Sequence, residues 1–334
     1  MIRWIISAWF VVMWMDHAAF TMETHAQLAS PVKIDGSSTV FPISEAVAEE
    51  FQKSTRGAVR VTVGISGTGG GFKKFCRGET DIQDASRPIS VDEMEECRKH
   101  GIHYFELPIA FDAMTLVVSP KNTWLQSITL PELKRMWEPS AQGTITSWKQ
   151  INPAWPDEPF KLFGAGSDSG TFDYFTEAVV GKAKSSRGDY TASEDDNTLV
   201  RGISADKAAI GYIPYAYYPP NKQKLNLIGV DAGQGPVLPS RETVENGTYR
   251  PLSRPLFIYV SKKSADRTEV KRFVEFYLKE GLTLAEQVKY VPLPADAYRT
   301  AFTHFRNGKL GTVFQGRTSV GLRIDDLLGR ESIQ

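Results

Sequence analysis

The chain has 334 residues, of which 41% are hydrophobic and 23% charged, and its 39 basic residues balance its 39 acidic ones. This length is sufficient for two domains with separate cores, and the composition is that of a globular protein. The balance of charge gives no reason to expect a nucleic-acid partner or binding to a membrane surface.

The first 29 residues are typical of a secretory signal. Arg3 precedes a strongly apolar run over residues 5–15, and a polar stretch with small-residue cleavage sites follows. About 11 apolar residues are too few to span a bilayer, which takes roughly 20. We therefore expect a mature chain that begins between Gln27 and Ser30, has no membrane span after processing and is located in the periplasm. No cysteine lies near the cleavage region, so a lipid anchor is not expected.

Strand patterns and helix patterns alternate along the rest of the chain, which predicts an α/β fold. Strands are predicted at residues 32–34, 59–65, 80–82, 114–119, 210–213 and 257–260. Helices are predicted after residues 36–42, 66–72 and 166–172, from Ser90 to Gly101, and over residues 129–138 and 266–279.

Two extended segments, residues 106–115 and 253–260, are predicted to cross between two lobes. The first lobe would combine residues 30–112 with residues 255–334, and the second would contain residues 113–254. A ligand would then lie in the cleft between the lobes, and two flexible connections would allow the cleft to close by a hinge motion.

Three loops rich in Gly, Ser and Thr lie at predicted strand-to-helix turns, where open α/β sheets bind ligands. They are residues 36–42 (the first loop), 66–72 (the second loop) and 166–172 (the third loop). A helix N-terminus exposes unpaired N–H groups and a partial positive charge, which suits it to hold an anion. Three such loops predict one shared site for a small tetrahedral oxyanion, with phosphate as the leading candidate.

Cys76 and Cys97 are the only cysteines of the chain. They are too few and too far apart for a zinc site. In an exported protein, an even count favours one disulfide bond, here between the helix after the second loop and the next helix. Two buried thiols are the alternative.

Charged residues near the loops are candidates for recognising the anion. Arg87, held before Pro88, offers a bidentate partner for an oxyanion or forms a surface salt bridge. Asp84, Asp168 and the acidic residues 194–196 are possible acceptors, although the acidic run is equally compatible with a solvated turn. Because phosphate keeps a proton at neutral pH, a carboxylate acceptor distinguishes it from fully ionised sulfate.

Enzymatic functions have less support in the sequence. Ser169 follows an aspartate as in some serine proteases, but neither His100, His103 nor His304 lies in a recognisable setting for a catalytic base. No His and Asp spacing suits a two-metal hydrolase, and the loops match neither dinucleotide nor Walker A patterns. We expect no enzyme activity, no cofactor and no metal. Binding of another oxyanion (sulfate, molybdate, arsenate or a phosphonate), a secreted phosphohydrolase, and a binding protein used for sensing remain open.

Five motifs occur together, in order, between Lys33 and Gly311. They are Gly-Ser-Ser-Thr-Val-x-Pro at residues 36–42, Ser-Gly-Thr-Gly-Gly-Gly-Phe-Lys-Lys-Phe at 66–75, Asp-Ala-Ser-Arg-Pro-Ile at 84–89, Asp-Ser-Gly-Thr-Phe-Asp-Tyr-Phe at 168–175, and Ala-Ile-Gly-Tyr-Ile-Pro-Tyr-Ala-Tyr-Tyr at 209–218. Together they resemble the periplasmic phosphate-binding proteins of phosphate ABC transporters. The resemblance implies a two-lobed type II periplasmic binding fold, and a monomer that closes on one phosphate and delivers it to a membrane permease.

The resemblance also implies which residues bind the anion. By motif, these are Ser38, Thr39 and Val40 in the first loop, Ser66, Gly67, Thr68 and Gly69 in the second, and Ser169, Gly170 and Thr171 in the third.

The chain departs from the family pattern at Arg87, where well-known members have an aspartate. Those members carry an arginine shortly before the Ser-Gly-Thr segment, at a place where this chain has residues 164–166, Gly-Ala-Gly. We therefore predict an exchange of roles, with Arg87 as the cation that binds the anion and Asp168 as the acceptor of its proton.

Overall fold

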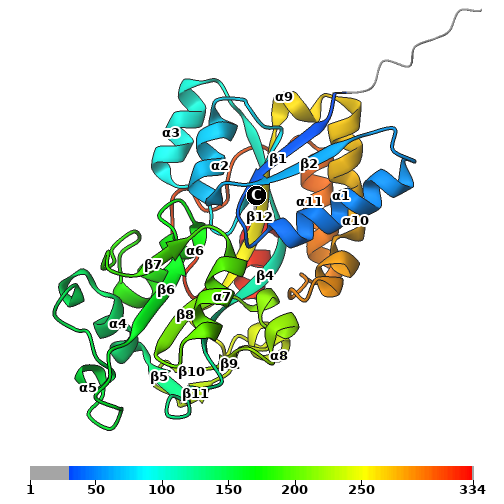
Figure 1. Ribbon diagram of the computed structural model, residues 1–334. Helices are drawn as coiled ribbons and strands as arrows, with labels where there is room; N and C mark the ends of the chain where they lie inside the picture. The colour runs from blue at the N-terminus through cyan, green and yellow to red at the C-terminus, as the bar shows by residue number, and fades with distance from the viewer. Residues whose placement is uncertain (1–29, 333–334) are drawn as a thin grey trace, which may run out of the picture.

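A computed structural model describes residues 30–332 of the chain. The predicted secretory signal, residues 1–29, lies outside the described residues. The described chain forms two α/β lobes, drawn one above the other in Figure 1. None of the helices within residues 30–332 combines the length and the apolar character that a membrane crossing requires.

The upper lobe is built on five neighbouring strands with helices on both sides. The strands, in spatial order, are β2 (Val61–Ile65), β1 (Val32–Gly36), β3 (Ile82–Ala85), β12 (Ser253–Ser261) and the first part of β4 (Tyr104–Val118). Strand β1 is parallel to β2 and β3, whereas β12 is antiparallel to β3 and β4. One side carries α2 (Gly67–Cys76) and α3 (Val91–Lys99), and the other carries α1 (Phe41–Ser54), α10 (Thr268–Gln287) and α11 (Ala295–Arg306) (Figure 1). The short helix α9 (Lys262–Ala265) leads into α10, and α12 (Ile324–Ser332) ends the described chain.

The lower lobe continues the same sheet through the last part of β4. Its strands are β8 (Ala209–Pro214), β6 (Lys161–Ala165) and β7 (Thr191–Ser193), with β9 (Asn226–Leu227) also paired to β4. A second, small sheet contains β11 (Pro236–Val237), β10 (Gly229–Asp231) and β5 (Ser127–Thr129). The helices are α4 (Leu130–Trp137), α5 (Trp148–Ile151), α6 (Gly170–Phe175), α7 (Asp196–Ala205) and α8 (Arg241–Glu245). Short 3-10 turns lie at Pro139–Ala141, Tyr215–Tyr217 and Pro219–Asn221, and a π-helical turn at Thr176–Val180 follows α6.

Aromatic stacking forms part of the core of the lower lobe. The rings of Phe175 and Tyr212 are stacked with centroids 3.8 Å apart, and Trp137 meets both rings edge-on. This packing fixes α6, which follows the third loop, against the face of β8.

Strand β4 passes through both lobes. Its residues 104–113 pair with β12, and Met114–Val118 pair with β8. The two segments predicted to cross between lobes are therefore adjacent antiparallel strands. The division of the chain after Asp112 and before Pro255 stays a prediction, with which this change of strand partner is compatible.

The predicted elements are present, but the bounds of several differ from those predicted. The strand predicted at residues 80–82 is β3, at Ile82–Ala85, and the strand predicted at 257–260 belongs to β12, which begins at Ser253. The helix predicted at residues 266–279 is α10, which continues to Gln287, and the strand predicted at 114–119 is only the last part of β4. Strand β4 is buried along its whole length, so it shows no alternation of polar and apolar residues from which its start could be read. The capping box predicted at Ser90 and Glu93 is present at the start of α3.

Cys76, at the end of α2, and Cys97, in α3, form the predicted disulfide bond. Both residues are buried, and 21 positions of sequence separate them.

Replacing both cysteines by serine is expected to lower the free energy of unfolding by about 3 kcal/mol, because the unfolded chain is released from a loop of this size. Urea unfolding with and without reductant measures the change. Reductant should destabilise the wild type by a similar amount and leave the double variant unaffected. A reduced wild type as stable as the oxidised protein would contradict this expectation.

Candidate anion-binding site

The starts of α1, α2 and α6 meet between the two lobes. Thr39 of the first loop and Thr171 of the third are both buried, and their hydroxyl oxygens lie 3.1 Å apart across 132 positions of sequence. Thr68 of the second loop lies close by, since a Cβ added to Gly170 would be 2.5 Å from its hydroxyl oxygen. The structure thus brings one hydroxyl of each loop to a common point.

Local hydrogen bonds explain why the helices begin at this point. The Ser169 hydroxyl accepts the backbone N–H of Thr171 and caps α6, and the Ser37 hydroxyl accepts the N–H of Thr39. Pro42 stands in the first turn of α1, where its missing N–H is not needed. These contacts hold the hydroxyl-bearing residues at the helix starts, where the backbone dipole favours a negative charge.

Arg254 supplies the positive charge at the point where the loops meet. This arginine of β12 is 0% exposed. Its Nη2 atom lies 3.1 Å from the Thr39 hydroxyl oxygen and 2.8 Å from that of Thr171, and Nη1 lies 3.3 Å from the carbonyl oxygen of Gly170. Its Nε and Nη2 atoms also donate to Asp112 Oδ2, at 3.2 Å and 3.0 Å. Sequence analysis missed Arg254 and Asp112 as site residues.

Two buried carboxyl groups lie near Arg254. Burial raises the pKa of Asp112, and the charge and hydrogen bonds of Arg254 oppose this rise. Burial also raises the pKa of Asp196, to about 7, against a hydrogen bond with the Ser38 side chain and the charge of Arg254. The Oδ2 atom of Asp196 has no hydrogen-bond partner among the described residues. Asp196 therefore offers a buried acceptor beside the first loop.

Arg87 and Asp168 do not join this cluster. The guanidinium of Arg87 is bonded to Glu93 and Asp173, and the carboxylate of Asp168 is 46% exposed and pairs with Lys73 at 2.8 Å. These contacts do not favour the predicted exchange of roles, which stays a prediction.

The other predicted site residues lie at or beside the meeting point. Thr68 is within 3.2 Å of the Ser86 hydroxyl, and the side chain of Val40 is buried in the core of the upper lobe. The Ser66 hydroxyl donates to Asp35. Asp84, also considered as an acceptor, is buried and accepts the Ser44 hydroxyl at 2.9 Å, and burial raises its pKa to about 8.

Direct contacts between the lobes hold the cluster closed. The backbone N–H of Gly69 donates to the carbonyl oxygen of Asp168 at 2.8 Å, and the hydroxyl of Tyr217 donates to the carbonyl oxygen of Ser38 at 3.1 Å. A Cβ added to Gly67 would be 2.5 Å from that same Asp168 oxygen. The second and third loops therefore approach each other so closely that only glycine fits at position 67.

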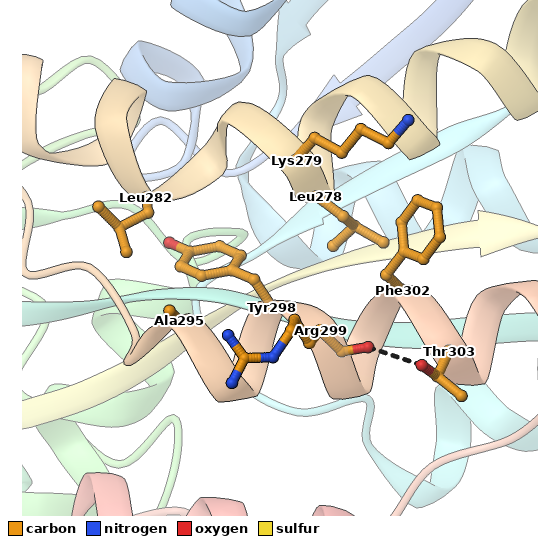
Figure 2. Close-up of a pocket in the computed structure, with 8 residues that line it drawn as sticks. All are labelled: Leu278, Lys279, Leu282, Ala295, Tyr298, Arg299, Phe302 and Thr303. Atoms are coloured by element: carbon orange, nitrogen blue, oxygen red, sulfur yellow. Dashed lines mark hydrogen bonds between the residues drawn. The ribbon is translucent and has the colours of Figure 1, made fainter.

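A separate groove lies on the outer helices of the upper lobe (Figure 2). It has a volume of about 500 Å³ and lies between α10 and α11, lined by Leu278, Lys279, Leu282, Ala295, Tyr298, Arg299, Phe302 and Thr303. None of these residues belongs to the three loops, so the groove is not part of the candidate site. Within residues 30–332 no group of His, Cys, Asp and Glu side chains is arranged to hold a metal ion.

A signal for Arg254 exists in the sequence. The tripeptide Ser-Arg-Pro occurs at residues 86–88 and again at residues 253–255, and the second copy is followed by the apolar run Leu256–Val260. A charged residue next to a strand that is otherwise apolar is expected to be paired or functional, because burying a lone charge is costly.

Comparisons with known proteins identify the family of the chain. A family model described as a PBP superfamily domain matches residues 21–280. The chain is 51% identical over 310 residues to Protein SphX of Synechocystis sp., with 92% of each chain covered. It is 36% identical over 305 residues to Phosphate-binding protein PstS of Staphylococcus saprophyticus, with 90% of this chain and 86% of the relative covered.

Solved structures of proteins named as phosphate-binding are also similar to this chain. A possible phosphate binding protein from Planctomyces limnophilus is 46% identical, with a TM-score of 0.62 and coverage of 84% of this chain and 99% of that chain. A putative phosphate ABC transporter substrate-binding protein from Clostridium perfringens, solved with bound phosphate, is 26% identical, with a TM-score of 0.67 and coverage of 79% and 100%. These matches confirm the fold class predicted from the sequence.

Proposed function

Because the chain belongs to the PBP superfamily, and within it to the family that includes SphX and the phosphate-binding protein PstS, we propose that it binds inorganic phosphate between its lobes for delivery to an ABC permease. The observation that carries this proposal is the convergence of the starts of α1 and α6 on one buried arginine, Arg254, with Thr68 at the start of α2 close to Gly170. The family is one of binding proteins, and no enzymatic step is needed for this function.

The chemistry of the cluster suits a tetrahedral anion. Hydroxyls of Thr39, Thr68 and Thr171, backbone N–H groups at the helix starts and the guanidinium of Arg254 all donate hydrogen bonds, and phosphate oxygens accept them. About eight charge-assisted hydrogen bonds of roughly 1.5–3 kcal/mol each contribute about 12–24 kcal/mol. Association costs free energy, because the ligand and the protein lose translational and rotational freedom. After this cost is subtracted, enough remains for the roughly 8 kcal/mol of micromolar binding.

Asp196 is the proposed acceptor of the phosphate proton. It is buried, it lies beside Ser38, and one of its oxygens has no partner among the described residues. An ionised carboxylate here accepts a hydrogen bond from protonated phosphate and repels sulfate, which carries no proton. Asp168, which sequence analysis favoured, is exposed and paired with Lys73.

Isothermal titration at pH 8 tests both the ligand and the acceptor. The wild type is expected to bind phosphate at least 100-fold more tightly than sulfate, and Asp196→Asn is expected to lower that ratio at least tenfold, since an amide can donate to sulfate. The matched control is Asp195→Asn, because Asp195 is the N-cap of α7 and asparagine caps a helix equally well.

Preference for sulfate, molybdate or a phosphonate in the same titration would overturn the phosphate assignment. An unchanged ratio of phosphate affinity to sulfate affinity in Asp196→Asn would show that another carboxylate accepts the phosphate proton. Turnover of a phosphomonoester by the purified wild type, lost in Ser169→Ala, would support a secreted phosphohydrolase instead.

We also propose that the mature protein is a monomer in the periplasm, with the permease as its partner. This rests on the secretory signal predicted in the first 29 residues and on the family. Nucleic acid is not an expected partner, given the balanced charge.

A further inference from the structure

Arg87 connects the two lobes through two carboxylates. Its Nη1 and Nη2 atoms donate to the two carboxylate oxygens of Glu93, at 2.8 Å and 2.7 Å, and its Nε atom donates to Asp173 Oδ2 at 2.7 Å. Glu93 belongs to α3 of the upper lobe, whereas Asp173 belongs to α6 of the lower lobe. The Arg87 side chain is only 11% exposed, so water screens these contacts little.

The two carboxylates differ in how firmly they hold Arg87. Glu93 is fixed by the capping box of α3, and although burial opposes it, the charge of Arg87 and its hydrogen bonds lower the pKa of Glu93. Burial raises the pKa of Asp173 despite the charge of Arg87, and Asp173 Oδ1 has no hydrogen-bond partner among the described residues. Arg87 therefore keeps its charge partner within the upper lobe if the lobes separate, and the contact with Asp173 is the one that is lost.

The position of Asp173 links this contact to the proposed binding site. Asp173 lies two residues after Thr171, on the short helix that begins at the third loop. Figure 1 shows α6 at the top of the lower lobe, directly beneath α2. Phe72 of α2 lies under the guanidinium of Arg87, with its ring centroid 5.8 Å away. Any motion that brings the third loop onto an anion also brings Asp173 to Arg87.

We propose that the pair Arg87–Asp173 is a latch between the lobes that slows release of the bound anion, without contacting the anion itself. This inference rests on the proposed binding of phosphate. Arg87 acts here as a positioning residue, held rigid by Glu93 and bonded to the lower lobe only when the cleft is closed.

Stopped-flow measurement of phosphate binding and release tests the latch with the full mature chain. Asp173→Ala leaves the Arg87 Nε without an acceptor in the closed form, so release is expected to be at least tenfold faster, with the association rate within twofold of the wild type. Asp173→Asn keeps an oxygen that accepts the Nε hydrogen, so its release rate is expected to lie between those of the wild type and Asp173→Ala.

Lys73→Ala is the matched control. It removes another ion pair between the lobes, Lys73 with Asp168, whose side chains are 64% and 46% exposed. Because exposed ion pairs contribute little, release from this variant is expected to stay within twofold of the wild type.

The same data separate the latch from direct binding of the anion by Arg87. If Arg87 bound phosphate, removal of Asp173 would free its guanidinium, and release would be slower or unchanged. Release from Asp173→Ala within twofold of the wild type would therefore overturn the latch while wild-type binding still supported the proposed function.

A wild type that binds no phosphate would overturn the proposed function. In that case small-angle scattering of the ligand-free protein decides on the latch. A larger radius of gyration in Asp173→Ala than in the wild type and Lys73→Ala would support it, and identical radii would overturn it.

Discussion

Replacing Arg254 by methionine is expected to weaken phosphate binding by at least 1,000-fold. Arg254 is fully buried and donates to Thr39, Thr171 and Gly170, so it provides the positive charge at the proposed site. A 1,000-fold loss corresponds to about 4 kcal/mol, which two or three charge-assisted hydrogen bonds of roughly 1.5–3 kcal/mol each supply. Isothermal titration measures the loss.

The same substitution leaves the carboxylate of Asp112 buried without its partner. Removing one member of a buried ion pair typically costs about 3–5 kcal/mol of stability, so a loss of binding by Arg254→Met alone could reflect unfolding. The double variant Arg254→Met with Asp112→Asn removes both charges, and it should regain stability in urea unfolding while binding phosphate no better. A double variant that binds like the wild type would show that Arg254 has no role in holding the anion.

Replacing Gly67 by alanine is expected to prevent the lobes from closing. The new methyl group would be 2.5 Å from the backbone oxygen of Asp168 in the other lobe, and a backbone atom cannot rotate away as a side chain can. We expect phosphate affinity to fall at least 100-fold, and small-angle scattering to show that saturating phosphate no longer compacts the variant.

A matched variant separates the contact between the lobes from backbone strain. Gly67 has a φ of +73°, and Gly57 has a φ of +76° with no atom within 4 Å of its added Cβ. Alanine at either position carries a cost of about 1–2 kcal/mol for the left-handed conformation. Only Gly67→Ala should lose affinity, and equal affinities of the two variants would show that the close approach of the lobes does not contribute to binding.

Local sequence signals predicted much of the fold and part of the candidate site. The three loops could be recognised because glycine, serine and threonine are favoured where a helix begins near a ligand. The disulfide bond was predicted from an even cysteine count in an exported chain. The start of β4 could not be read, since a strand buried on both faces carries no alternating pattern.

The prediction of the site was limited because some of its side chains contact residues that are distant in the sequence. Ser86-Arg87-Pro88 and Ser253-Arg254-Pro255 look alike, and their different surroundings arise from the tertiary structure. Arg87 meets Glu93, six positions away in a capping box, as well as Asp173, 86 positions away. Arg254 meets Asp112 because β12 and β4 are neighbouring strands, which only the topology reveals.

The position of β12 has a consequence for the order in which the protein folds as it is made and secreted. This strand lies between β3 and β4, although it follows β4 by more than a hundred residues of chain. Until synthesis and export have delivered residue 261, β3 and β4 lack their common neighbour. The edge of each strand that pairs with β12 is unpaired until then. The N-terminal third of the polypeptide therefore depends on the C-terminal third to become native, and a nascent chain halted earlier would be a substrate for chaperones and proteases.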